Sequence, residues 1–162
     1  AWLAVVQARI LGITFLLSVL TLVWVADIFA YFAGRAFGLR FTRNKLAPSI
    51  SPGKSWEGVW GGLAGVLCLA VAWVAADRYF QADVASFYTR LYSAGWWFLA
   101  IAVVFMVAMS VAGDLVESLI KRSAGVKDSS GLLPGHGGVL DRVDALLPTL
   151  PLALMLTRLI SV

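Results

Sequence analysis

Two pairs of acidic residues, each spaced three positions apart, are the most chemically suggestive feature of this 162-residue sequence. Asp114 and Glu117 close one apolar stretch, and Asp141 and Asp144 open the next. Residues three apart lie on the same face of a helix, so each pair presents two carboxylates together. Acids at membrane depth are costly and usually face a partner or an aqueous cavity. The two pairs therefore predict a hard oxygen site suited to Mg²⁺ and substrate phosphates.

The segment between these pairs combines cations with glycines. Its basic residues and glycines include Lys121, Arg122, Lys127, Arg142, Gly131, Gly135, Gly137 and Gly138. Glycine lets a backbone approach a ligand closely, so this composition suits a polyphosphate. Two simpler interpretations stay open: a solvated basic loop at a membrane face, or ion pairs such as Asp141 with Arg142 and Glu117 with Lys121. For Asp144 a further alternative is a structural role, as an acid in the first turn of a helix that interacts favourably with the helix dipole.

A second polar segment reads Ser51-Pro52-Gly53-Lys54-Ser55. It resembles the end of a nucleotide-binding phosphate loop, but that motif requires a glycine at position 48, which is proline. What remains is a compact turn that presents Lys54 and the hydroxyls of Ser51 and Ser55 at a helix start, where free N–H groups favour anions. The alternative is a purely structural helix start, with Ser55 as the N-cap and Glu57 in the first turn.

The amino-acid composition indicates that the chain is a membrane protein, so membrane helices must position these polar segments. Hydrophobic residues make up 60% of the chain, charged residues 14%, and the mean hydropathy is +0.87. Soluble domains have about 45–50% apolar and about 25% charged residues. The single Cys68 excludes an intramolecular disulfide, and with the single His136 it cannot form a thiolate or imidazole zinc site. Any metal must therefore be held by oxygen.

Four apolar stretches are candidates for transmembrane helices, since about 20 residues span the hydrocarbon core. They cover residues 10–26 (continuing to 33), 59–76, 96–113 and 143–160. The last contains Pro148 and Pro151 and is predicted to be a kinked span, because neighbouring helices can satisfy the freed backbone groups.

The connecting segments set the orientation. Residues 34–58 and 120–142 carry nine cations together, whereas residues 77–95 carry two. The positive-inside rule places the first two segments in the cytoplasm. In the outer segment Phe80, Val84, Phe87 and Leu91 have helical spacing, which predicts a short interfacial helix. The fold class is an all-α integral membrane protein with about four transmembrane helices, two cytoplasmic polar loops and this short helix, forming one domain over residues 1–162.

The segment 118–144 resembles the signature of the phosphatidate cytidylyltransferase family, membrane enzymes that make CDP-diacylglycerol from CTP and phosphatidic acid. The matching positions are Ser118, Lys121, Arg122, Lys127, Asp128, His136, Gly137, Gly138, Asp141, Arg142 and Asp144. The segments 27–35 and 51–58 also resemble the family, with Ser55 where threonine is more common. Family members carry further amino-terminal spans, so the chain is interpreted as the carboxy-terminal catalytic part of a longer polytopic enzyme.

The resemblance implies a role for each group of residues. The catalytic set would be Asp114, Lys121, Arg122, Lys127, Asp128, His136, Asp141 and Arg142. The substrate-binding set would be Ser51, Lys54, Ser55, Gly137 and Gly138, and the metal set Asp114 and Asp141, followed by Asp144, Glu117 and Asp27. The metal would be Mg²⁺, with a second metal ion also accommodated. His136 would bond a phosphate, orient pyrophosphate or close its loop on a carbonyl.

The expected partners are CTP, phosphatidic acid and the lipid bilayer, with no nucleic acid, and a homodimer is one assembly left open. The expected location is the bacterial inner membrane, with the active site on the cytoplasmic side. A cation- or proton-coupled transporter is the alternative function, since Asp27, Asp114 and Asp144 would suit an ion path. A CDP-alcohol phosphotransferase is disfavoured because its Asp-Gly and Ala-Arg motif is absent around Asp114. A catalytically silent subunit is disfavoured because the acids of the signature are all present.

Overall fold

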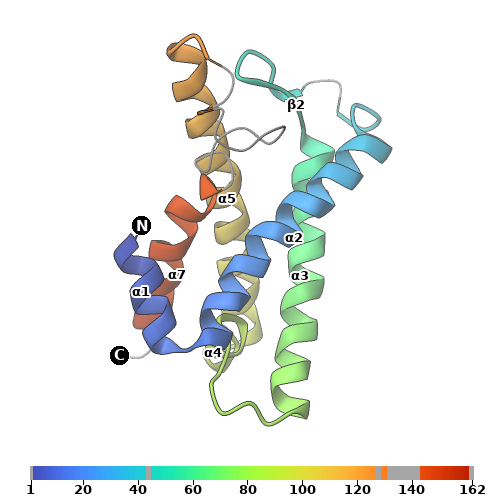
Figure 1. The fold of residues 1–162 in the computed structure, drawn as a ribbon. Coiled ribbons are helices and arrows are strands. Elements are labelled where there is room, and N and C mark those ends of the chain that lie inside the picture. Colours follow the sequence, from blue (N-terminus) through green and yellow to red (C-terminus); the bar gives the residue numbers. More distant parts are fainter. Residues whose placement is uncertain (1, 43–44, 127–128, 131–142, 161–162) are drawn as a thin grey trace.

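The computed structural model describes residues 2–42, 45–126, 129–130 and 143–160, which form a bundle of helices topped by a small hairpin (Figure 1). The helices are α1 (Trp2–Leu11), α2 (Ile13–Phe37), α3 (Trp56–Tyr79), α4 (Phe87–Ser93), α5 (Trp96–Ser123) and α7 (Leu146–Ile160). The strands are β1 (Lys45–Ala47) and β2 (Ser51–Ser55). The chain is therefore mostly helical, as predicted from its composition.

Three helices are long and apolar enough to cross a membrane: α2, α3 and α5, with 25, 24 and 28 residues. In their most apolar stretches only 33%, 28% and 33% of the residues are buried, so most of these residues keep part of their surface outside the protein core. This is the pattern expected of lipid-facing helices, and it confirms three of the predicted spans. The first one begins later than predicted, because Gly12 with φ +137° separates α2 from the short helix α1.

The fourth predicted span, residues 143–160, is shorter than predicted. Helix α7 has 15 residues with Pro151 inside it. At 1.5 Å per residue it is about 22 Å long, which is less than the hydrocarbon thickness of about 30 Å. The described residues therefore contain three full-length candidate spans and one shorter apolar helix in place of the fourth.

Helix α4 corresponds to the predicted interfacial helix, but it is shorter and lies inside the bundle. Its residues Phe87, Tyr88 and Leu91 are completely buried. Phe80, which the spacing assigned to the same helix, lies outside it and is 75% exposed. The apolar face of α4 thus packs against neighbouring helices, whereas the sequence interpretation had it facing lipid.

Polar contacts fasten α4 to the long helices. Asp77, near the end of α3, accepts hydrogen bonds from the Ser86 amide at 3.1 Å and the Thr89 hydroxyl at 2.6 Å. Ser18 of α2 accepts a hydrogen bond from the Phe87 amide at 3.0 Å. These bonds satisfy donors of the first turn of α4, which has no preceding helical turn to bond.

A two-stranded hairpin, which the sequence did not predict, accompanies the helices. Strands β1 and β2 are antiparallel, with Lys45 opposite Ser55 and Ala47 opposite Ser51. Strand β1 has only three residues, and β2 contains Pro52 and Gly53, so neither shows the alternating apolar pattern that predicts a strand. Contacts at the two ends of the hairpin, described below, hold it in place.

Helices α2 and α3 pack closely because small residues line their contact. A Cβ atom added at Gly58 would lie 2.9 Å from the Ala30 carbonyl oxygen, and one at Gly62 would lie 2.8 Å from that of Ala26. Small residues permit this close backbone approach between membrane helices. The hairpin, the end of α2 and the end of α5 lie at one end of the bundle, and α4 lies at the other (Figure 1). This is the relative arrangement predicted for segments 34–58 and 77–95 and, in segment 120–142, for the part at the end of α5 that the structure describes.

Candidate active site

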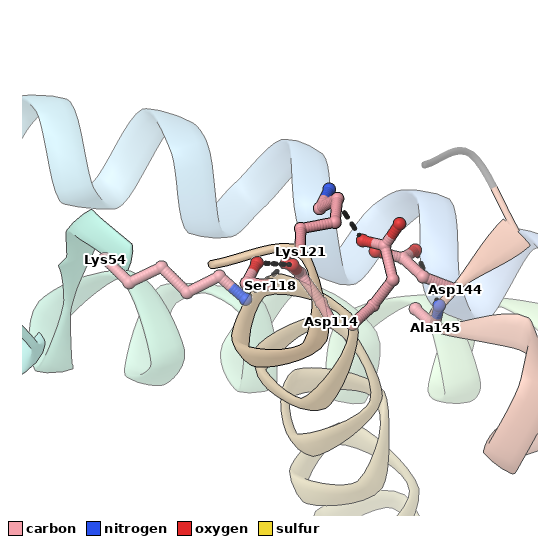
Figure 2. Close-up of polar contacts among 7 residues, drawn as sticks. Lys54, Asp114, Ser118, Lys121, Asp144 and Ala145 are labelled. Carbon is pink, nitrogen blue, oxygen red and sulfur yellow. Dashed lines mark hydrogen bonds and ion pairs between the residues drawn. The ribbon is translucent and has the colours of Figure 1, made fainter. Parts of the chain in front are cut away.

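Asp114 of α5 is the residue at which the separate parts of the site meet. One of its carboxylate oxygens forms an ion pair with the ammonium of Lys54 from β2, as Figure 2 shows. The other oxygen accepts a hydrogen bond from the Ser118 hydroxyl at 3.3 Å. The side chains of Lys54 and Asp114 are 25% and 32% exposed, so the pair remains accessible to a ligand. The hairpin therefore places a cation directly on the first predicted metal ligand.

Close packing of α5 against the start of α7 brings a second acid to the site. A Cβ atom at Gly113 would lie 2.8 Å from Pro148 Cγ and 3.1 Å from the Asp144 carbonyl oxygen. Any larger residue would push the two segments apart. Because Gly113 directly precedes Asp114, this contact sets the separation of Asp114 and Asp144.

Asp114, Glu117 and Asp144 form a carboxylate triad. Each offers one oxygen atom, and these three atoms lie within 4.8 Å of one another. Glu117 is only 7% exposed and pairs with Lys121 of the next turn at 2.9 Å. Asp144 accepts a hydrogen bond from the Ala145 amide at 2.6 Å (Figure 2). Three acids at this separation repel one another, and oxygen ligands from carboxylates are those that Mg²⁺ prefers, so the triad fits a divalent cation.

The surroundings of Asp144 disfavour its charged form. Burial, the largest cause, raises the pKa of this carboxyl above its usual value. The hydrogen bond from Ala145 acts in the opposite direction, and the negative charge of Asp114 raises the pKa further. A bound cation would offset the repulsion from Asp114 that contributes to this shift.

A cavity of about 480 Å³ opens beside Asp114, between α2, the hairpin, α3 and α5. Its polar lining consists of Asp27, Tyr31, Arg35, Lys54, Ser55 and Asp114. Small apolar residues of the three long helices, such as Ala26, Val59 and Val107, complete it. Charged groups of both signs at one end and apolar walls within the bundle suit a ligand with a phosphate group and a hydrocarbon portion.

The structure brings together several residues predicted from sequence. Asp114, Glu117 and Asp144 form the triad, Lys54 and Lys121 pair with its members, and Asp27 lines the cavity. Ser55 also lines the cavity, but its hydroxyl accepts a hydrogen bond from the Gly58 amide at 3.2 Å. The structural alternative for Ser55, an N-cap of α3, is therefore confirmed.

Other predicted residues lie farther from the triad or outside the described part of the chain. Ser51 begins β2, and Arg122 is exposed in the last turn of α5. The predicted residues outside the described ranges are Lys127, Asp128, His136, Gly137, Gly138, Asp141 and Arg142.

Two cavity residues, Tyr31 and Arg35, were not assigned to the site from sequence. A guanidinium nitrogen of Arg35 donates a hydrogen bond to the Tyr31 hydroxyl at 3.0 Å. Their spacing in the sequence could have indicated this role. Asp27, Tyr31 and Arg35 are spaced four apart and so lie on one face of α2. That face is the one that lines the cavity.

The fold and the site together define a multi-pass membrane protein with a charged cavity and a carboxylate triad at one end of its helices. A sequence profile described as the cytidylyltransferase family matches residues 1–160. The chain belongs to this family.

Relatives in the family carry a more specific name. The chain is 51% identical over 140 residues to the phosphatidate cytidylyltransferase of Haemophilus influenzae, covering 86% of this chain and 44% of that protein. It is 46% identical over 136 residues to that of Pseudomonas aeruginosa, covering 84% and 44%, and 40% identical over 146 residues to that of Thermotoga maritima, covering 90% and 49%. The chain thus spans less than half the length of these relatives.

Proposed function

We propose that this chain carries the catalytic part of a phosphatidate cytidylyltransferase, as a single domain. The observation that carries the proposal is the carboxylate triad of Asp114, Glu117 and Asp144, with Lys54 on one of its acids and a partly apolar cavity beside it. A triphosphate requires a metal site and cations, and a lipid substrate requires an apolar space at the membrane. The named relatives support this assignment over a transporter or a CDP-alcohol phosphotransferase.

In the proposed reaction a phosphate oxygen of phosphatidic acid attacks the α-phosphorus of CTP. A new P–O bond forms, the bond between the α-phosphorus and the bridging oxygen to the β-phosphate breaks, and pyrophosphate leaves with the bonding electron pair. The product is CDP-diacylglycerol. The lipid supplies the nucleophile, so the protein has to position the two substrates and stabilise developing charge.

The residues around the triad divide this work. Asp114, Glu117 and Asp144 would hold Mg²⁺, and Asp27 and Asp141 are the candidates for a second metal ion. Bound there, Mg²⁺ would neutralise charge on the triphosphate. Lys54, Lys121 and Arg122 add cations at the same end of the bundle, and Lys127, Asp128, His136 and Arg142 complete the proposed catalytic set. The hydroxyl of Ser51 and the backbones of Gly137 and Gly138 would contact the nucleotide.

Arg35 of α2 gives the cavity a second cation besides Lys54. The Tyr31 hydroxyl orients its guanidinium, and a guanidinium matches the geometry of phosphate oxygens. We assign the phosphate of phosphatidic acid to this part of the cavity, with the acyl chains toward its apolar walls. CTP would then bind at the hairpin and the triad, on the cytoplasmic side of the membrane.

The proposal is tested with the full-length protein that contains this chain, purified in detergent or kept in membranes. Labelled CTP and phosphatidic acid are supplied with and without Mg²⁺, and lipid-linked label is measured. We expect labelled CDP-diacylglycerol and equimolar pyrophosphate only when both substrates and Mg²⁺ are present. A protein that is folded and binds CTP, yet forms no lipid product over a range of divalent cations, would refute the activity. Size measurement of the same sample tests the homodimer.

A further inference from the structure

A buried glutamate at the start of α3 fastens the chain segment that follows α2. One carboxylate oxygen of Glu57 accepts hydrogen bonds from the Phe41 amide at 3.1 Å, the Thr42 amide at 2.7 Å and the Thr42 hydroxyl at 2.8 Å. The Glu57 side chain is only 7% exposed. Three donors on this oxygen compensate part of the cost of burying the carboxylate, whose second oxygen has no hydrogen-bond partner among the described residues.

The backbone before these donors is bent so that they face Glu57. The Gly38 amide still bonds the Gly34 carbonyl at 2.9 Å, as in a helix, but Leu39 adopts φ +64°. A non-glycine residue rarely adopts this left-handed conformation, and it persists where surrounding contacts hold it. The turn directs two consecutive amides to a single acceptor. It also includes a hydrogen bond from the Arg40 amide to the Phe37 carbonyl at 2.9 Å.

The hairpin is therefore attached at both of its ends. On the side of β1, Glu57 holds residues 41 and 42, which precede the strand. On the side of β2, Ser55 caps α3 through the Gly58 amide. Lys54 lies between these attachments and extends from β2 to Asp114 (Figure 2). Glu57 contacts neither Lys54 nor Asp114 in the described contacts, so any influence on the site passes through the backbone.

We propose that Glu57 is a positioning residue, which holds the hairpin so that Lys54 meets Asp114 over the cavity. As a role in catalysis, this rests on the proposed function. Removing Glu57 would release residues 41 and 42 from α3. In the described contacts the hairpin would then be held at its Ser55 end and by the Lys54 ion pair itself. Lys54 would occupy a wider range of positions, and fewer molecules would present it to the substrate at any moment.

A double-mutant cycle distinguishes this role from a general effect on folding. In the full-length protein, Glu57→Ala should lower kcat/KM for CTP by about tenfold. The same substitution in a Lys54→Ala background should change kcat/KM by less than about twofold, because the group through which Glu57 acts is already gone. Glu57→Gln retains an acceptor oxygen and should recover part of the loss, and Thr42→Val, which removes one of three donors, should have a smaller effect.

Asp77 offers a matched control. It also accepts one backbone amide and one hydroxyl bond and fastens a loop to a helix, but at the opposite end of the bundle. Asp77→Ala should lower thermal stability as Glu57→Ala does, and its effect on kcat/KM should be the same with and without Lys54. If the two carboxylate variants behave alike in the cycle, the positioning role is wrong.

A crosslinking measurement tests the geometry without relying on activity. Lys54→Cys and Asp114→Cys are combined in full-length protein that has no other cysteine, and a short bifunctional thiol reagent is added in membranes. The pair should crosslink efficiently, and adding Glu57→Ala should reduce the yield severalfold while Asp77→Ala does not. Unchanged crosslinking with Glu57→Ala, or additive effects in the cycle, overturns the inference. If Glu57→Ala reduces crosslinking but the full-length protein without any substitution has no transferase activity, the proposed function alone is refuted.

Discussion

The ammonium of Lys54 lies against the carboxylate of Asp114, and that carboxylate belongs at once to the cavity and to the triad. This ion pair joins the hairpin to the membrane-spanning helix α5. It lies where a triphosphate and a metal ion would meet in the proposed reaction. A metal ion could replace Lys54 as the partner of Asp114, and the freed ammonium could then pair with a phosphate. This exchange would involve little movement, because both side chains are partly exposed. This contact leads to the first two predictions.

Asp114→Asn should abolish turnover while the protein remains inserted and folded. The substitution keeps the side-chain size but removes one charge from a hard oxygen site, and it also breaks the ion pair with Lys54. We expect at least a hundredfold loss of kcat at saturating Mg²⁺, which corresponds to about 2.7 kcal/mol of barrier. Asp83→Asn, an exposed acid at the other end of the bundle, is the control. Activity within threefold of wild type in Asp114→Asn across a Mg²⁺ titration would exclude Asp114 as a ligand.

Lys54→Ala should weaken the use of CTP more than it weakens the fold. A charge-assisted contact is worth about 1.5–3 kcal/mol, so kcat/KM for CTP should fall by about ten- to a hundredfold. Lys45, exposed on the partner strand β1, provides a matched control, since Lys45→Ala removes an equal charge from the same hairpin. Steady-state kinetics on both variants at equal folded amounts measures the difference. Equal losses would mean that the hairpin contributes only general positive charge.

The elements of this fold that could be predicted from the sequence are those with a regular pattern of apolar or charged residues. Long uncharged stretches identified α2, α3 and α5, because every backbone group in a membrane helix is bonded within the helix. The three-residue spacing of Asp114 and Glu117 placed both acids on one face of α5, and they do share the triad. Helical periodicity also indicated α4, although not that its apolar face packs against protein.

The hairpin and the glutamate that holds it could not be predicted in this way. Lys54 reaches Asp114 only because the position of β2 is fixed by contacts with segments that are distant in sequence. Likewise, nothing local to Gly113 indicates that Pro148 will lie against it. Such contacts depend on how the helices pack. The pattern of a single sequence predicts which face of a helix or strand is buried, but it does not predict which element packs against that face.

The two ends of the bundle should be accessible from opposite sides of the membrane, with the site end facing the cytoplasm. The reason is the excess of cations on the segments at that end. Gly53→Cys and Asp83→Cys, both at exposed positions, are introduced separately into a Cys68→Ala background. An impermeant thiol reagent added outside intact cells should label position 83 and not position 53. Labelling of position 53 from outside would reverse the orientation and with it the cytoplasmic CTP site.

Gly113→Ala should separate α5 from the start of α7 and impair the site without removing any polar group. The added Cβ would lie 2.8 Å from Pro148 Cγ and 3.1 Å from the Asp144 carbonyl oxygen, and overpacking of this kind typically costs about 1–3 kcal/mol. We expect a lower thermal midpoint, a higher Mg²⁺ concentration for half-maximal activity and a reduced kcat, because Asp144 moves away from Asp114. Adding Pro148→Ala removes the nearer obstacle and should restore part of both stability and Mg²⁺ affinity. If Gly113→Ala lowers stability but leaves the Mg²⁺ dependence unchanged, the spacing of the two acids is set elsewhere.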